Sequence, residues 1–278
     1  MKRILTLIVI SIFIAVYAQA QKDSLEKSEV QFKLSVNYNS HLNYYGRTDS
    51  LRSSGFFPLA ELWFNQKFYI NVAPVFVNNA AESFDYAGTV ATAGYQFISN
   101  EKKWFGNFYV VKPFYKENSQ LVQSALKAQA AFNITNLNKI INMTGGADIK
   151  FSDKVDFGLT GGIDHIFRKQ FEDNSVLVID PSAFLFAGTQ QFTNTYYKQN
   201  SFLFFPGVGQ KVSEEVKTFN ALSYEFSMSI IFAKGKFQLI FIPAYVIPKN
   251  LITVEGRPDL SERGKEMFYT TIGAKLIL

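Results

Sequence analysis

The side chains that most often carry chemistry are scarce in this chain. Its 278 residues include no Cys and only two His, His41 and His165. A chain without Cys has no disulfide framework, thiolate metal site or cysteine nucleophile. Two distant histidines also supply too few ligands for a metal site, which usually needs three or more. We therefore expect no cofactor and no metal centre.

Neither histidine has the neighbours of a catalytic base. Some barrel-forming lipid hydrolases place His and Ser two residues apart on a strand, but Asn43 follows His41 at that spacing. Phe167 follows His165 in the same way. Asp164 precedes His165, and neighbours on a strand point to opposite faces, so they form no acid–base dyad. We expect no enzyme; a lipid-modifying enzyme is a remote alternative that replacing both histidines would test.

Residues 1–20 have the parts of a secretory signal peptide. Lys2 and Arg3 form a basic start, residues 4–18 carry no charge, and a small-x-small cleavage site ends at Ala20. The alternative is an uncleaved N-terminal membrane anchor, but the uncharged run is shorter than the roughly 20 residues that such an anchor needs. Cleavage after Ala20 lowers the formal net charge of +5 by two. Export and the absence of a Lys/Arg run argue against a nucleic-acid partner.

The rest of the chain alternates apolar and polar residues with a period of two. Residues 222–229, for example, read Leu-Ser-Tyr-Glu-Phe-Ser-Met-Ser. Stretches of about ten such residues, separated by turn residues, predict β-strands. About twelve segments follow this pattern, and a count between about 10 and 14 is compatible with it. They span 30–42, 56–65, 67–77, 84–98, 104–115, 119–134, 140–151, 155–168, 177–190, 216–233, 236–247 and 267–278.

Short turns alternate with longer gaps at 43–55, 191–215 and 248–266. Short turns at one end and long loops at the other are typical of a transmembrane β-barrel. Two connections break strict alternation, since 169–176 is long for an inner turn and 152–153 is short for an outer loop. The rival is a soluble β-sandwich. Long strands, aromatic pairs at strand ends and charges at mid-strand favour the barrel.

The end of the chain resembles the β-signal of bacterial outer-membrane barrels. That signal has a polar residue, one spacer, Gly, two spacers, and then two hydrophobic residues separated by one position. The positions are filled by Thr271, Gly273, Leu276 and Leu278, with Leu at the end where Phe is commonest. The resemblance implies that the barrel assembly machinery recognises the last strand.

The mature chain also resembles poorly characterised outer-membrane β-barrel proteins of Bacteroidota. The Ala-Gln-Ala-Gln processing site, the strands rich in Phe, Tyr, Asn and Lys, and residues 121–127 carry this resemblance. It brings no established activity and no catalytic residues.

Together these features predict an all-β fold, a single transmembrane antiparallel β-barrel of about twelve strands over residues 29–278. A short periplasmic extension at 21–28 would join it to the cleaved signal peptide, and outer-membrane lipid would surround it. Pro74, Pro113 and Pro243 fall within predicted strands. Because proline lacks a backbone N–H, these positions imply bulges or strand ends.

The predicted inward face carries six positive and five negative charges. The candidate lumen-lining residues are Lys33, Glu61, Lys67, Lys127, Asp148, Lys150, Asp156, Asp164, Arg168, Glu225 and Lys275. Their near balance argues against strong ion selectivity, and opposite charges in a narrow lumen would pair because an unpaired buried charge is costly.

The expected function is a passive outer-membrane channel or transport protein for small solutes. Barrels of about eight strands are filled by side chains and those of 16–18 hold a water channel, so about twelve lies between these limits. The alternative is a structural or interaction barrel without an open pore. It would bind a partner protein, lipid or glycan through the loops at 43–55, 191–215 and 248–266.

Overall fold

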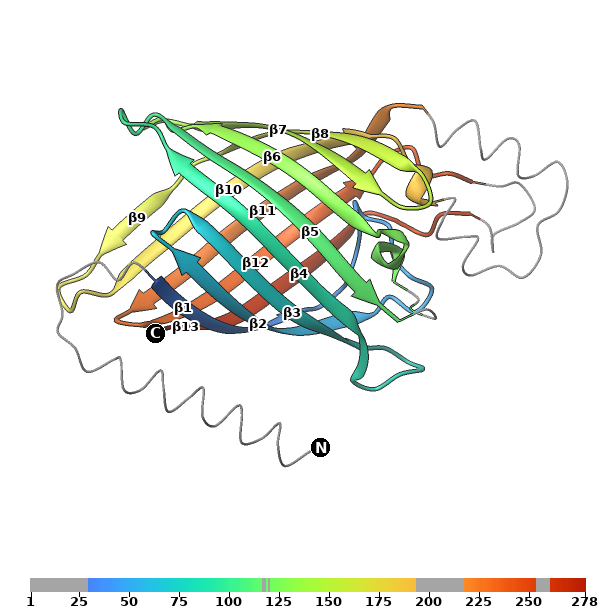
Figure 1. Cartoon of the computed structure of the whole chain (residues 1–278), viewed down its shortest axis with the longest axis horizontal. Helices are drawn as coiled ribbons and strands as arrows, with labels where there is room; N and C mark the ends of the chain where they lie inside the picture. Colours follow the sequence, from blue (N-terminus) through green and yellow to red (C-terminus); the bar gives the residue numbers. More distant parts are fainter. Residues whose placement is uncertain (1–29, 117–118, 120, 194–217, 254–260) are drawn as a thin grey trace, which may run out of the picture.

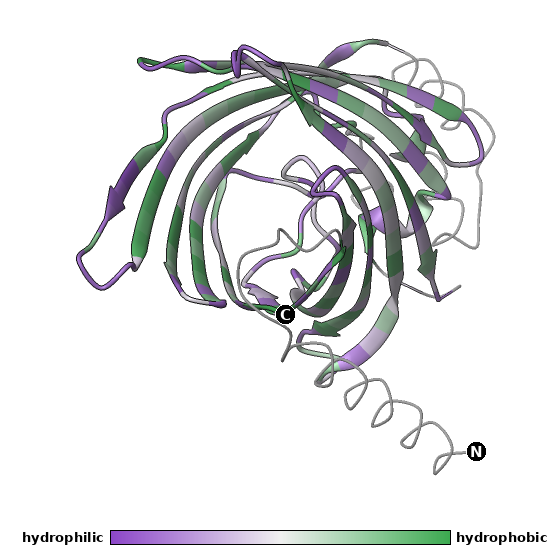
Figure 2. Ribbon diagram, turned by 60° about the vertical axis from the view of Figure 1, so that its left-hand side comes forward, coloured by the Kyte–Doolittle hydropathy of each residue, from purple (hydrophilic) through white to green (hydrophobic). Residues whose placement is uncertain are grey.

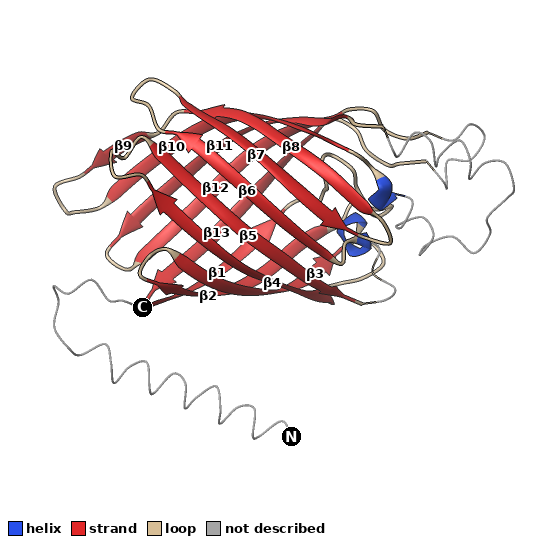
Figure 3. Ribbon diagram, turned by 45° about the horizontal axis from the view of Figure 1, so that its top comes forward, coloured by secondary structure: helices blue, strands red, loops and turns tan. Residues whose placement is uncertain are grey.

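The computed structural model describes residues 30–116, 119, 121–193, 218–253 and 261–278. These residues form antiparallel strands, the short 3₁₀ helix η1 (Val122–Ala125) and a helical turn at 191–193 (Figures 1 and 3). No helix in this part of the chain is long and apolar enough to cross a bilayer. The predicted signal peptide (1–20) and extension (21–28) lie outside the described residues.

The strands correspond to the predicted segments, except that β6 begins later than expected and residues 155–168 form two strands. They are β1 (Val30–Asn39), β2 (Ser54–Phe64), β3 (Phe68–Asn78), β4 (Asp85–Ile98), β5 (Trp104–Tyr115), β6 (Ala128–Asn136), β7 (Asn142–Phe151), β8 (Val155–Asp164), β9 (Phe167–Gln170), β10 (Val176–Gly188), β11 (Asn220–Lys234), β12 (Phe237–Pro248) and β13 (Met267–Ile277).

The sheet closes on itself. Each strand except β8 pairs with the next along the chain, β8 pairs with β10, and β1 pairs with β13. β8 and β9 follow one another along the same edge of β10, so the described residues form a twelve-stranded barrel plus the extra strand β9. The predicted all-β barrel of about twelve strands is therefore confirmed. Closure pairs both edges of the twelve barrel strands, whereas β9 pairs with β10 on one side only.

The connections divide the barrel into two ends. The turns β2–β3, β4–β5, β6–β7, β9–β10 and β11–β12 and the C-terminus share one end, here called the short-turn end. The other connections form the long-loop end. Alternation of ends is strict, because the β7–β8 connection of residues 152–154 belongs to the long-loop end despite its shortness. The apparent inner loop at 169–176 is shorter than expected, since β9 extends to Gln170.

One predicted segment begins too early. Residues 119–134 were expected as one strand, but β6 starts at Ala128 and η1 precedes it. The apolar residues Leu121, Val122 and Leu126 are buried in clusters at the long-loop end. Packing there, which local alternation does not report, determines the conformation of this stretch.

The two faces of the wall differ in polarity. Large apolar side chains are exposed on the outer face, including Phe68 (42%), Phe226 (49%) and Phe268 (60%). Hydrophobic and hydrophilic residues alternate along the strands in Figure 2. Exposed aromatic residues occur near both ends, among them Trp104 at the short-turn end and Phe114 at the long-loop end. An apolar outer band with aromatic ends suits a lipid environment.

The prolines explain where the ladders are interrupted. Pairing between β2 and β3 skips the positions around Pro74, and pairing between β11 and β12 skips Pro243. Pro113 lies beyond the last β5–β6 pair. The break between β8 and β9 falls opposite Pro181, whose carbonyl accepts the N–H of His165 at 3.2 Å. Each proline thus occupies a site where a neighbouring ladder is incomplete.

Candidate functional site in the barrel interior

The predicted lumen residues separate into two groups. Lys33, Glu61, Asp148, Lys150, Asp156, Asp164, Glu225 and Lys275 lie on the inward phase of their strands. Lys67 in the β2–β3 turn, Lys127 before β6 and Arg168 on β9 are exposed at the rims. Lys127 pairs there with Asp153 at 2.9 Å. Three of the six positive charges counted from the sequence therefore lie at the barrel rims.

A basic cluster lies inside the barrel on β1, β2 and β13. Lys275 Nζ is 2.7 Å from Glu61 Oε1, and Glu61 Oε2 accepts a hydrogen bond from Trp63 Nε1 at 3.1 Å. Lys33 Nζ lies 4.2 Å from the centre of the Trp63 ring. Adjacent inward positions in the register bring these groups together. The cluster leaves one positive charge in excess on this wall.

A second cluster stands on the opposite side of the bore. Lys150 Nζ pairs with Asp148 on β7, and both side chains are nearly inaccessible to solvent. The ring of Tyr45, from the β1–β2 connection, lies 5.3 Å from Lys150 Nζ. Tyr45 also packs against Phe186 of β10, with ring centroids 5.3 Å apart. A loop residue from β1–β2 thus contacts β7 and β10.

This contact means that a loop crosses the bore. β1 and β7 stand six positions apart in the closed order of twelve strands, so they lie on opposite walls. Residues 40–53, here called the crossing loop, connect β1 to β2 and still reach β7. Tyr44 and Arg47 exchange backbone hydrogen bonds of 2.8 and 3.0 Å, and Tyr45 and Gly46 between them have positive φ. Positive φ at both central residues is typical of a two-residue type I′ hairpin turn, which favours Gly at its second central position.

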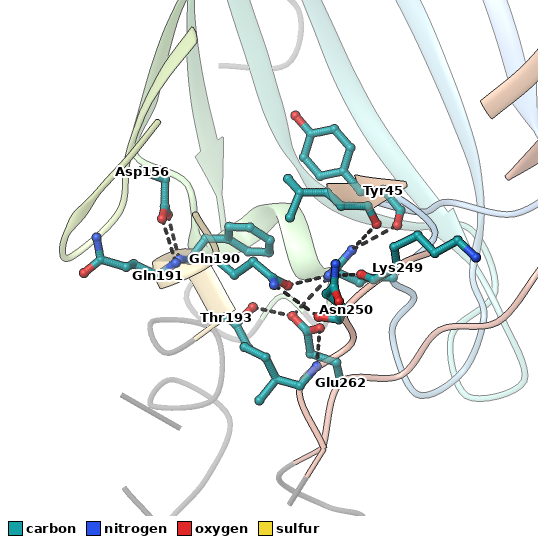
Figure 4. Close-up of polar contacts among 12 residues, drawn as sticks. Tyr45, Asp156, Gln190, Gln191, Thr193, Lys249, Asn250 and Glu262 are labelled. Carbon is teal, nitrogen blue, oxygen red and sulfur yellow. Dashed lines mark hydrogen bonds and ion pairs between the residues drawn. The ribbon is translucent and has the colours of Figure 1, made fainter. Parts of the chain in front are cut away.

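Arg47 fastens the tip of the crossing loop. Its side chain is buried and donates hydrogen bonds to Glu262 Oε1 (3.0 Å), Gln190 Oε1, and the carbonyls of Tyr45 (3.1 Å), Leu222 (3.2 Å) and Lys249 (3.2 Å) (Figure 4). These acceptors come from the crossing loop, β11 and the connections after β10 and β12. One guanidinium, with its five donors in a rigid fork, therefore joins segments from several sides of the mouth.

Glu262 completes this arrangement, which we call the mouth network (Arg47, Gln190 and Glu262). Its Oε1 also accepts the hydroxyl of Thr193, and its Oε2 accepts the N–H of Ile252 at 2.9 Å. Gln190 Nε2 donates to the carbonyl of Asn250 at 3.1 Å. The buried charges are thus paired and hydrogen-bonded, as burial requires.

Asp156 supports the same mouth from β8. Its carboxylate accepts the Thr189 hydroxyl (2.6 Å) and the backbone N–H groups of Gln191 (2.6 Å) and Phe192 (2.8 Å). Phe192 then packs edge-on against Tyr44 with centroids 5.0 Å apart. Burial raises the pKa of Tyr44 well above its usual range, and burial also raises the pKa of Tyr45. The crossing loop is therefore held by apolar packing as well as by the mouth network.

Burial changes along the axis of the barrel. Toward the long-loop end, Lys150, Asp156 and Val246 are almost fully buried. Toward the short-turn end, the inward residues Asp164 and Asp180 keep part of their surface accessible. Inward residues near the short-turn end are not uniformly accessible, since Glu61 and Asn142 are also buried there. The nearly inaccessible residues Lys150 and Asp156 mark tight packing around the crossing loop.

The mouth network was absent from the sequence-based candidates. Arg47 and Glu262 are 215 positions apart and belong to loops predicted only as partner-binding segments. Neither residue stands in a periodic pattern or motif, so no local signal identifies the pair. The partner role of those loops stays a prediction, and residues 194–217 and 254–260 lie outside the described part of the chain.

The histidines have ordinary surroundings. His41 Nδ1 lies 3.2 Å from Ser40 Oγ, and the His165 ring packs against Phe167 with centroids 4.3 Å apart. No group of three or more potential metal ligands occurs among the residues that the structure describes. That the chain is not an enzyme stays a prediction.

Comparison with known proteins gives the fold and no more. No protein-family model matches the chain, and no curated protein is similar to it. A solved structure described as KdgM porin matches with TM-score 0.50 and 8% identity over 88% of this chain and 98% of that chain. NanC porin matches with TM-score 0.44 and 8% identity over 88% of this chain and 98% of that chain. An outer membrane channel from Pseudomonas putida F1 matches with TM-score 0.45 and 10% identity over 92% of this chain and 100% of that chain. The chain thus has the outer-membrane β-barrel fold, and the resemblance to Bacteroidota proteins stays a prediction.

Proposed function

We propose that this protein is a passive outer-membrane channel for small polar solutes, constricted at its long-loop end by the crossing loop. The observation that carries the proposal is that one closed wall exposes apolar side chains on its outer face and carries charged side chains on its inner face. The outer face exposes apolar side chains, while the inner face presents Lys, Asp, Glu, Asn and Ser side chains, several of them accessible. A barrel with a filled apolar core would need neither the inward charges nor their accessibility.

The constriction limits what such a channel passes. The bore is blocked at the long-loop end by buried contacts between Tyr45 and β7 and by the mouth network. Passage therefore requires a displacement of the crossing loop, and only small solutes would follow a partial displacement. We place the long-loop end outside the cell, the arrangement that bacterial barrels share.

The last strand also fits an assembly role. β13 closes the barrel by pairing with β1, and Leu276 on it is exposed on the outer face. Gly273 points inward, where an added Cβ would lie 2.4 Å from Asn37 Oδ1. We propose that Thr271, Gly273, Leu276 and Leu278 form the signal read by the assembly machinery.

The channel function is testable by solute uptake. The refolded protein, shown to be a folded barrel by its heat-modifiable migration, would be placed in liposomes and swelling measured with uncharged sugars of increasing size. We expect swelling with the smallest solutes and a size limit that rises in Arg47→Met. Lys116→Met removes a cation from a half-exposed rim pair with Asp85 and should leave the limit unchanged. Folded liposomal protein that admits no solute, in the wild type and in Arg47→Met, would contradict the proposal.

A further inference from the structure

The charge inside the barrel is less balanced than the sequence suggests. Between the rims, the described strands carry three inward cations, Lys33, Lys150 and Lys275. They also carry six inward carboxylates, Glu61, Asp148, Asp156, Asp164, Asp180 and Glu225. Asp180 was missing from the sequence-based count, and three of the cations in that count lie at the rims.

The three inward lysines interact with groups outside β10, β11 and β12. Lys150 is buried against Asp148 and Tyr45, and Lys275 pairs with Glu61. Lys33 lies over the ring of Trp63 on the same wall as Lys275. All three cations are on β1, β7 or β13, so none is on β8, β10, β11 or β12.

Three carboxylates follow one another along the β8–β10–β11 wall, which we call the acidic wall (Asp164, Asp180 and Glu225). Asp180 faces Ser229, the next inward rung pairs Ser182 with Asp164, and the following rung pairs Phe184 with Glu225. Successive inward rungs are two residues apart, so the two steps from the Asp180 rung to the Glu225 rung span about 13 Å along a strand. The wall therefore presents a file of partly exposed carboxylates to the bore.

These carboxylates make no ion pair with any described residue. Asp164 accepts a hydrogen bond from Asn142 Nδ2 at 2.6 Å, and Glu225 lies beside Tyr269. One buried oxygen of Asp180 has no hydrogen-bond partner among the described residues, and Asp164 and His165 lie close enough to interact with it electrostatically. Arg168 occupies the next rung toward the short-turn end, where it is exposed. The negative charge of the wall is thus not neutralised inside the bore.

We infer that the acidic wall makes this channel prefer cations, so that its solutes are small inorganic or amine cations rather than anions. This inference rests on the proposed channel function. Carboxylates along a pore attract cations and repel anions, and a low-dielectric wall strengthens their field. The excess positive charge beside Trp63 faces the bore from another wall and reduces the preference without reversing it.

Ion selectivity provides the test. The reversal potential of the full-length refolded protein would be measured in planar bilayers across a KCl gradient, and the ratio of K⁺ to Cl⁻ permeability derived from it. We expect a ratio above about 3, falling toward 1 in Asp164→Asn/Asp180→Asn/Glu225→Gln, an estimate from the effect of charge rings in pores. Glu82→Gln/Glu101→Gln/Glu172→Gln neutralises three exposed carboxylates in the connections and should keep the wild-type ratio.

The outcomes separate the two proposals. Conductance with a wild-type ratio of 1 or below overturns the cation preference and leaves the channel intact. A wild-type preference that the acidic-wall variant retains also overturns the inference, because the charge would then act from elsewhere. If the triple variant does not fold, Asp180→Asn alone should lower the ratio partway. Heat-modifiable protein that never conducts would instead overturn the channel function.

Discussion

Releasing the crossing loop by a single substitution is the sharpest consequence of the mouth network. Arg47→Met keeps a long apolar stem but removes five hydrogen bonds and the only described cation paired with Glu262. The Glu262 side chain, 3% exposed, would then remain buried as an unpaired charge. Breaking a buried pair from one side costs about 3–5 kcal/mol. That cost shifts the balance toward a displaced loop by roughly two to four orders of magnitude.

Hydrogen exchange resolves this effect residue by residue. The Leu42 and Arg47 amides donate hydrogen bonds to backbone carbonyls in the crossing loop. Their protection factors should fall by roughly two to four orders of magnitude, while strand amides keep their protection. Lys116→Met, which breaks a half-exposed pair, should change protection by less than about 1 kcal/mol. Arg47→Met/Glu262→Leu should regain part of the loss, because it removes the orphaned carboxylate. Wild-type protection of the loop in Arg47→Met would refute the reasoning.

Three further predictions concern the same interior. Because burial raises the pKa of Tyr44 and Tyr45 above the usual value near 10, closure of the mouth is favoured below that pH and weakens as pH rises past it; ultraviolet titration together with conductance would record both changes. Lys150→Met leaves Asp148 buried without its cation, so exchange at the crossing loop should accelerate by at least tenfold as an order-of-magnitude estimate. Gly162→Ala places a Cβ about 2.1 Å from the Phe184 ring and should cost about 1–3 kcal/mol in urea unfolding, whereas Gly161→Ala meets open space and should cost less.

The barrel wall follows from the sequence because strand periodicity is local. Alternating residues such as Leu222 to Ser229 face opposite environments whichever partner strand lies beside them. The same local logic placed most candidate lumen charges on the inward phase. It failed at the ends: Lys67 lies in a turn, and β8 ends near Pro181, beyond which Arg168 lies at the rim.

The constriction depends on contacts that no local pattern contains. Arg47 meets Glu262 only because closure brings β1 and β13 together and the loop turns at Gly46. Similarly, the expected near balance of lumen charge depended on assigning rim residues to the interior and on overlooking Asp180. The position of a charge along the axis, which decides whether water screens it, comes from the three-dimensional structure.

The most direct test of a channel constricted by the crossing loop is the single-channel conductance of heat-modifiable wild-type protein beside Arg47→Met in planar bilayers at one salt concentration. We predict small, brief openings in the wild type and larger or longer openings in the variant, because the loop is then less firmly held. Two folded proteins that both remain silent would contradict the account.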